Sequence, residues 1–366
     1  MSEGPFRRAI ADLVPYEPGK PVEEVQRELG LDRVVKLASN EGPFPPFPAA
    51  IEAMDRAVRE LNRYPDGGVW ALRAALADHH GVSFDEVVVG GGADGVIDLL
   101  SQATLDPGDE IVCGWPSFPS YVLDAAKLGA QSVRVPLRDH TYDLEALLAA
   151  ITPRTKLVYV CHPNNPTGTA NGRDELASFL GRVPAHVVVV LDQAYFEYID
   201  DPDYADGVED HFKQGRRVVV LRTFSKIYGL AGLRVGYGVA PADVVAATSK
   251  VRRAFDVSTT AQAAALASIG DDEELARRRA VNARGREQLV KVFAEHGVET
   301  VPSLGNFVYA IVGDGRLVFE ELLQLGVIVR PLHGFGAGDA IRVTVGTEDE
   351  NAFFADALGQ VLSRVS

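Results

Sequence analysis

Short runs of β-branched and apolar residues alternate with helix-type patterns through the middle of the chain, and this alternation constrains the fold most. The runs occupy residues 87–90, 110–113, 132–136, 156–161, 187–192, 217–223 and 235–239. Between them, apolar side chains recur at helical spacing over 93–102, 121–128 and 173–180. Strands that alternate with helices are typical of a mainly parallel sheet covered by helices. The sequence therefore predicts an α/β fold with right-handed crossovers.

The pattern changes after residue 258. A helix-rich stretch over 261–296 leads into separated strands at 306–312, 327–330 and 341–345, which predicts a smaller α+β domain. Near the N-terminus, Pro15 and the prolines of 43–48 prevent continuous helix or ladder pairing. We therefore predict an N-terminal arm over residues 1–42, a large domain over 43–258 and a small C-terminal domain over 259–366.

Charge and composition exclude several classes of protein. A formal net charge of −15 argues against nucleic-acid or anionic-membrane partners, which need a concentrated basic face. No apolar stretch approaches the roughly 20 residues of a membrane span. Only Cys113 and Cys161 could pair, so we expect a reducing, cytoplasmic location and no disulfide. The histidines form no HExxH or Cys/His pattern, so we expect no metal site.

The most informative local motif ends the apolar run at 217–223. It places Thr223, Ser225 and Lys226 after buried residues, and Arg234 follows shortly. Burial and nearby positive charge disfavour a protonated lysine, so its amine becomes a nucleophile for a carbonyl group. The two hydroxyls and the guanidinium fork suit a phosphate dianion. The motif therefore indicates an aldehyde cofactor that carries a phosphate, although an isolated lysine at a strand end is more often simply solvated.

Other strand ends carry polar groups of the same kind. Asp192 follows five apolar residues and precedes Tyr195. A buried aspartate could pair with a protonated ring nitrogen or cap a helix. Asn165 lies in a proline-rich loop after the strand at 156–161, where its amide could donate to a phenolate-type oxygen or only support a tight turn.

Three further features concern anions and aromatic rings. The glycine-rich turn at 90–95 precedes a helix, so the N–H groups around Ala93 and Asp94 could bind a phosphate. The same turn matches a dinucleotide-binding pattern, but the next strand lacks the acidic partner of that fold. Arg342 lies inside a β-branched strand and requires an anion. Phe118 could stack on a flat cofactor.

Together these motifs resemble the histidinol-phosphate aminotransferase family, within the fold-type I pyridoxal-phosphate transferases. The resemblance covers nearly the whole chain. It includes the opening motif at 37–41, the motif at 63–66 that contains Tyr64, the asparagine loop at 163–168, the lysine segment and the segment at 230–234. It implies amino transfer from L-histidinol phosphate to 2-oxoglutarate, with pyridoxal 5′-phosphate bound to Lys226 as a Schiff base.

The resemblance also implies roles for individual residues. Lys226 would move the substrate proton, Asp192 would pair with the ring nitrogen, and Asn165 and Tyr195 would contact the ring hydroxyl. Phe118 would stack on the ring. The phosphate would be held by Ala93, Asp94, Thr223, Ser225, Arg234 and, from the second subunit of a homodimer, Tyr64. Arg342 would bind the substrate anion, near Tyr16, Asn40 and Asn306.

Four residues depart from the family pattern: Gly42, Gly95, Gln193 and Phe118. Two of them, Gly42 and Phe118, lie near the expected substrate space, so the choice of substrate stays open at this point. An aromatic amino-acid aminotransferase is the closest alternative. A decarboxylase for a phosphorylated amino acid, such as threonine phosphate, uses the same cofactor, and an NAD-dependent oxidoreductase would rest on the glycine-rich turn alone.

Overall fold

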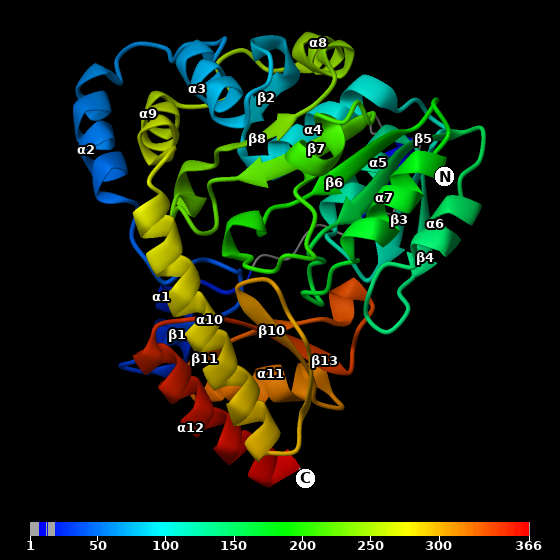
Figure 1. Ribbon diagram of the computed structural model, residues 1–366. Coiled ribbons are helices and arrows are strands. Elements are labelled where there is room, and N and C mark those ends of the chain that lie inside the picture. Colours follow the sequence, from blue (N-terminus) through cyan, green and yellow to red (C-terminus); the bar gives the residue numbers. More distant parts are fainter. Residues whose placement is uncertain (1–6, 12, 14–18, 366) are drawn as a thin grey trace.

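A computed structural model describes residues 7–11, 13 and 19–365 (Figure 1). Its central element is a seven-stranded sheet in the order β2-β8-β7-β6-β5-β3-β4. These strands match the seven predicted runs to within two residues: β2 (Val87–Gly90), β3 (Glu110–Trp115), β4 (Gln131–Pro136), β5 (Thr155–Cys161), β6 (Val188–Asp192), β7 (Val218–Thr223) and β8 (Gly236–Val239). β8 alone runs opposite to the other six strands, so the prediction of a mainly parallel, helix-covered sheet is confirmed.

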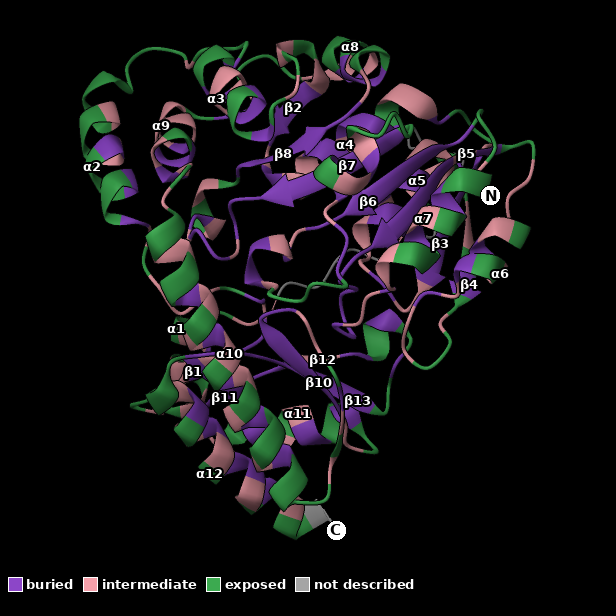
Figure 2. Ribbon diagram, viewed as in Figure 1, coloured by how far each residue is buried: buried purple, intermediate pink, exposed green. Residues whose placement is uncertain are grey.

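Helices cover both faces of this sheet. The chain moves toward β4 through α4 (Gly92–Thr104) and α5 (Ser120–Leu128) and returns through α6 (Leu144–Ala149) and α7 (Arg173–Arg182). Right-handed crossovers in opposite directions place the two pairs on opposite faces (Figure 1). Valines and other apolar residues of β2, β5, β6 and β7 are almost fully buried between them (Figure 2). This explains why those strands appear as uninterrupted apolar runs.

A second, four-stranded antiparallel sheet lies in the C-terminal part of the chain, in the order β12-β13-β10-β9. Its strands are β9 (Glu299–Val301), β10 (Phe307–Ile311), β12 (Arg330–Pro331) and β13 (Ala340–Thr344). The helices α10 (Asp272–Glu295), α11 (Gly315–Gln324) and α12 (Glu348–Val365) pack against its strands and share a hydrophobic core with them. The strand expected at 327–330 divides: β11 (Val327–Ile328) pairs with β1 (Val35–Lys36), and β12 pairs with β13.

The segment before the large sheet is attached to the C-terminal domain. It contains α1 (Val22–Leu29) and β1, and Val25 and Ala38 pack against Ile328. The described part of the arm therefore shares a core with the small domain. The expected domain limits stay predictions. The chain then passes through α2 (Pro48–Ala57) and α3 (Trp70–His80), which pack on α9 (Thr259–Ser268), while α8 (Ala242–Val251) packs on α4.

Both cysteines are free and buried, in β3 and β5. Among the described residues, no group of three or more His, Cys, Asp or Glu side chains is arranged to hold a metal ion. Within the same residues, every helix is too short or too polar to cross a membrane.

Candidate active site

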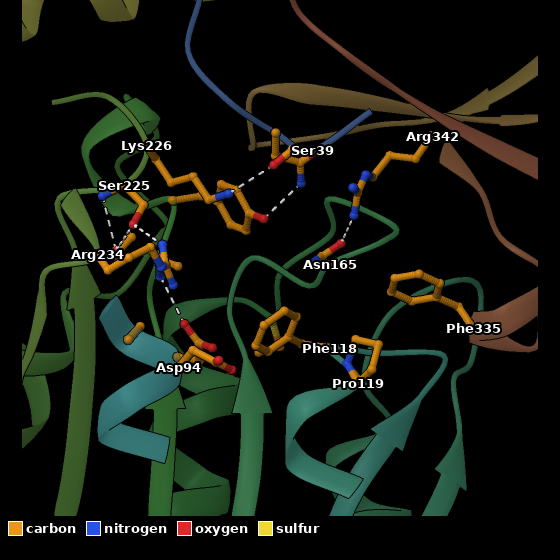
Figure 3. Close-up of a pocket in the computed structure, with 17 residues that line it drawn as sticks. Ser39, Asp94, Phe118, Pro119, Asn165, Ser225, Lys226, Arg234, Phe335 and Arg342 are labelled. Carbon is orange, nitrogen blue, oxygen red and sulfur yellow. Dashed lines mark hydrogen bonds between the residues drawn. The ribbon is translucent and has the colours of Figure 1, made fainter. Parts of the chain in front are cut away.

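The carboxyl ends of β5, β6 and β7 bring the predicted residues into one cavity. Cys161 and Asp192 are register partners, and Asp192 in turn pairs with Leu221, so the segments that follow the three strands emerge side by side. The cavity has a volume of about 150 Å³. Twelve predicted residues line it (Figure 3): Asn40, Ala93, Asp94, Phe118, Asn165, Asp192, Tyr195, Thr223, Ser225, Lys226, Arg234 and Arg342.

Lys226 projects its amine into this cavity from the turn after β7. The Nζ atom donates to the carbonyl oxygen of Ser39 at 3.3 Å. Burial of the amine, together with the positive charges of Arg342 and Arg234, lowers its pKa to about 7. A neutral, nucleophilic amine is therefore well populated near neutral pH.

Hydrogen-bond donors converge at one end of the cavity. Thr223 Oγ1 lies 3.0 Å from Ser225 Oγ, which also accepts from Arg234 Nη1 at 3.3 Å. Helix α4 begins beside them at Gly92 without a side-chain cap, so its first N–H groups are available to an anion. A Cβ atom on Gly92 would lie 2.7 Å from Arg234 Nη2. Because position 92 is glycine, the guanidinium of Arg234 can lie close to the first residue of α4. The donors that gather here suit a phosphate.

Asp192 is buried at the floor of the cavity. Its Oδ1 accepts from the Ala194 N–H at 3.1 Å, and its Oδ2 accepts from the Tyr121 hydroxyl at 2.6 Å. Burial raises the pKa of the carboxyl, and these two hydrogen bonds oppose the rise. The next helical turn begins at Phe196 with Tyr195 as its N-cap. The helix-cap alternative for Asp192 is therefore wrong.

Tyr195 is held by the segment before the large domain. Its hydroxyl accepts from Asn40 Nδ2 at 2.8 Å. The backbone N–H of Asn40 donates to Thr344 Oγ1 at 2.9 Å. This chain of hydrogen bonds links the large domain to β13 through Asn40.

Arg342, on β13, approaches the cavity from the small domain. Its Nη1 donates to Asn165 Oδ1, and its Nη2 donates to the Ala38 carbonyl at 2.7 Å. The guanidinium thus lies where three parts of the chain meet. Arg342 and Arg234 line the same cavity from opposite ends (Figure 3).

Two of the predicted residues that the structure describes, Asn306 and Tyr64, do not line the cavity within this chain. Asn306 is buried behind it and donates to the Asn40 carbonyl at 3.1 Å. Tyr64 is 82% exposed, and its ring stacks on Phe255 with centroids 4.6 Å apart. Tyr16 lies outside the described residues.

Comparison with known proteins decides the family. The family model for aminotransferase class I and II matches residues 32–358. The chain belongs to this family of aminotransferases. The histidinol-phosphate aminotransferase of Moorella thermoacetica is 45% identical over 359 residues, which cover 98% of this chain and 93% of the relative. That of Akkermansia muciniphila is 46% identical over 356 residues and covers 96% and 97% of the two chains.

Solved aminotransferases share the complete fold. The Sinorhizobium meliloti histidinol-phosphate aminotransferase, in complex with pyridoxal 5′-phosphate, is 28% identical, with a TM-score of 0.90 over 100% of this chain and 99% of that one. The Thermus thermophilus aspartate aminotransferase with maleate is 26% identical, with a TM-score of 0.85 over 99% of each chain. The match favours the phosphate interpretation of the glycine-rich turn in this aminotransferase over the dinucleotide one.

Several lining residues of this aminotransferase were not predicted: Ser39, Pro119, Cys161, Ala194 and Phe335. Four of them neighbour predicted motifs and could have been found by extending those motifs. Phe335 gave no such signal, because it lies in a glycine-rich turn of the small domain. It faces Pro119 and Phe118 across the cavity (Figure 3) and adds an apolar wall that sequence reasoning missed.

The structure shows what surrounds two of the residues that depart from the family pattern, Gly42 and Gln193. A Cβ atom on Gly42 would lie 3.2 Å from the Lys226 carbonyl oxygen and 3.5 Å from the Tyr198 hydroxyl. A larger residue at position 42 would therefore press on the backbone of Lys226. Gln193 uses both ends of its amide: it donates to the Tyr204 hydroxyl and the Ala205 carbonyl, and accepts from Arg222 and the Gly207 N–H.

Proposed function

We propose that this aminotransferase transfers the amino group of L-histidinol phosphate to 2-oxoglutarate, giving imidazole-acetol phosphate and L-glutamate, with pyridoxal 5′-phosphate as cofactor. The names of the 45–46% identical relatives support the substrate, and the cofactor of the Sinorhizobium structure supports the cofactor. One observation carries the proposal: a single cavity has an arginine at each end and, between them, a lysine whose pKa is lowered to about 7.

The residues at the Arg234 end fit the cofactor's phosphate. Two hydroxyls, a guanidinium and an uncapped helix start converge there, and each of these groups can donate to a dianion. Ala93 and Asp94 would contribute backbone N–H groups, while Thr223, Ser225 and Arg234 would contribute side chains. When bound, pyridoxal phosphate supplies an aldehyde that condenses with amines and a ring that accepts electrons.

Lys226 performs the proton transfer in this proposal. Burial lowers the pKa of its Nζ to about 7, so the neutral amine is accessible near neutral pH. A neutral amine can hold the cofactor covalently between turnovers. It can also accept the proton from the substrate carbon that bears the amino group and return it later. A pKa close to the working pH suits a group that acts as both base and acid.

The floor and walls of the cavity would orient the cofactor ring. The Asp192 carboxylate would stabilise a protonated ring nitrogen, and Phe118 would cover the ring face. Tyr195 and Asn165 would donate to the ring hydroxyl. The Asn40 amide donates to the Tyr195 hydroxyl at 2.8 Å, which fixes the orientation of that group.

Arg342 would bind the substrate anion. The planar guanidinium can form paired hydrogen bonds with either a phosphate or a carboxylate. This versatility matters because the amino donor carries a phosphate and the acceptor 2-oxoglutarate carries carboxylates. The carbonyl of Ala38 and the Asn165 side chain fix the guanidinium, and Asn40 and Asn306 lie nearby.

A second copy of the chain would complete the site. Exposed apolar side chains gather on neighbouring segments around α2, α3 and α9: Ile51, Val58, Leu61, Tyr64, Trp70, Phe255 and Leu266. Such a face favours association with another copy. In the homodimer, Tyr64 would reach the phosphate end of the partner's cavity. For the location of the enzyme, the two buried free thiols support the cytoplasm.

An aromatic amino-acid aminotransferase is the second candidate, and the apolar wall is the observation that supports it. Phe118, Pro119 and Phe335 could hold a phenyl ring as well as an imidazole. Arg342 would then bind an α-carboxylate. The distinction depends on the donor, because the cofactor and the lysine would act in the same way.

Growth of a histidine auxotroph tests the proposal. The gene is expressed in a host that lacks its own histidinol-phosphate aminotransferase, with Lys226→Ala as the matched control. Growth without histidine by wild type, and none by a soluble Lys226→Ala protein, is the expected result. Expression of folded wild-type protein without growth would contradict the proposed substrate.

A further inference from the structure

The hydroxyl of Tyr121 makes the shortest contact to Asp192. Its Oη donates to Asp192 Oδ2 at 2.6 Å, and both residues are buried. The ion pairs among the described residues do not include Asp192. The carboxylate accepts two hydrogen bonds, from the Tyr121 hydroxyl and the Ala194 N–H. Of the nearby charges, that of Lys226 lowers the pKa of Asp192 and that of Asp94 raises it. Such a buried charge is costly unless it is hydrogen-bonded.

The direction of this hydrogen bond is fixed. Burial, and then the charge of Asp192, raise the pKa of the Tyr121 hydroxyl well above its ordinary value. The phenol therefore keeps its proton and donates, while the carboxylate accepts. The bond in turn opposes the burial that raises the pKa of Asp192.

The ring of Tyr121 is also fixed, by contacts on its face and its edge. It stacks on Tyr159 with centroids 4.3 Å apart and an interplanar angle of 11°. It meets Phe118 edge to face, at 5.6 Å and 77°. Tyr121 therefore contacts both the carboxylate on the cavity floor and the aromatic side chain on its wall.

We propose that Tyr121 is a positioning residue that prepares Asp192 and Phe118 for the cofactor ring. Its hydroxyl holds Asp192 ionised and aims the carboxylate into the cavity, and its ring sets the tilt of Phe118. This inference rests on the proposed function, in which Asp192 meets the ring nitrogen and Phe118 covers the ring. Sequence motifs give no indication of this role.

The hydroxyl is isolated by Tyr121→Phe, which keeps both aromatic contacts. Without that donor, Asp192 takes up a proton at higher pH, and a protonated carboxyl cannot pair with a protonated ring nitrogen. Cofactor retention should therefore begin to fall, as the pH is lowered, about one to two pH units earlier than in wild type, the shift expected for one hydrogen bond to a charged group. The measurement is equilibrium dialysis of the cofactor-loaded protein across a pH series.

Tyr159→Phe is the matched control, because its hydroxyl lies 3.4 Å from Ser101 and does not touch Asp192. Its retention curve should coincide with that of wild type. A Tyr121→Phe curve that also coincides with wild type, or equal shifts in both variants, would overturn the inference. Wild-type protein that retains no cofactor at any pH would overturn the proposed function as well, so the two failures are distinguishable.

The ring contact has its own test. Tyr121→Leu removes the edge-to-face contact as well as the hydroxyl. The induced circular dichroism of the bound cofactor, which reports how its ring is held, should be reduced in Tyr121→Leu and preserved in Tyr121→Phe. Equal signals in both variants would overturn the part of the inference that concerns Phe118.

Discussion

The guanidinium of Arg342 donates a hydrogen bond to the side-chain oxygen of Asn165, across 177 residues of sequence. This contact joins β13 of the small domain to the loop after β5, at the rim of the cavity. In the proposed function, an anion bound by Arg342 would share the guanidinium with Asn165. Substrate binding would then be coupled to the contact between the two domains.

Replacing Arg342 by lysine keeps the positive charge but removes the planar guanidinium. Lysine cannot form two parallel hydrogen bonds to one anion, so kcat/KM should fall about 10- to 100-fold for both the amino donor and 2-oxoglutarate. Steady-state kinetics with each substrate varied in turn measure the change. Arg217→Lys, at an exposed pair with Asp243, is the control. An unchanged KM for both substrates would show that the anion binds elsewhere.

Phe335 should discriminate between the two substrates of the enzyme. It lines the cavity but is otherwise packed in the small domain, with 4% of its surface exposed. In the proposed function, Phe335→Leu would remove an aromatic contact from the ring-bearing donor and none from the aliphatic acceptor. The kcat/KM for the donor should fall up to about tenfold, while that for 2-oxoglutarate stays constant. Equal losses for both substrates would indicate a general packing defect.

The lowered pKa of Lys226 predicts the pH dependence of apoenzyme stability. Between about pH 7 and the ordinary value of 10.5, the unfolded lysine is protonated and the folded one is mostly neutral. The unfolded state therefore binds more protons, so the free energy of unfolding gains a positive slope with pH in this window. Lys226→Met lacks that contribution. Urea unfolding at several pH values should show wild type gaining stability relative to the variant as pH rises, and parallel curves would contradict the shifted pKa.

Gln193 should not tolerate replacement by glutamate. A carboxylate cannot donate to the Ala205 carbonyl, and Arg222 already meets Asp206 at 2.9 Å. Gln193→Glu should lower the free energy of unfolding by about 1–3 kcal/mol, as measured by urea unfolding. Gln131→Glu, at an exposed position of β4, should change it little. A Gln193→Glu protein as stable as wild type would mean that the network rearranges around the new charge.

The homodimer is tested by placing a charge on the exposed apolar face. Trp70 is 65% exposed at the start of α3. Trp70→Glu should shift the sedimentation coefficient from dimer to monomer and weaken cofactor retention, since Tyr64 would no longer reach the partner's site. Val290→Glu, on α10 with 37% exposure, is the control. A dimer that survives Trp70→Glu unchanged would place the interface on another face.

The strands of the large sheet were predictable because β-branched runs buried on both faces leave a continuous signal. The antiparallel direction of β8 could not be predicted, since Gly236–Val239 has the same burial pattern in either direction. The division of 327–330 between two sheets was also hidden. It depends on the pairing of Val35 with Val327, a contact between distant segments.

The site was predictable where chemistry imposes a residue type. Lys226, Asp192 and Arg342 are expensive to bury without a function, and each gave a signal at a strand end or within a strand. Tyr121 and Phe335 gave none, because an aromatic residue among apolar neighbours is most often part of a core. Their contacts to Asp192 and to the cavity depend on the tertiary structure.

The central claim is that L-histidinol phosphate is the amino donor. The most direct measurement mixes the cofactor-loaded protein with L-histidinol phosphate, and separately with L-phenylalanine, in the absence of acceptor, and follows the cofactor absorbance through a single half-reaction. Much faster conversion by L-histidinol phosphate is the predicted result. Faster conversion by L-phenylalanine would contradict it and make the chain an aromatic amino-acid aminotransferase, and no conversion by either would contradict both assignments.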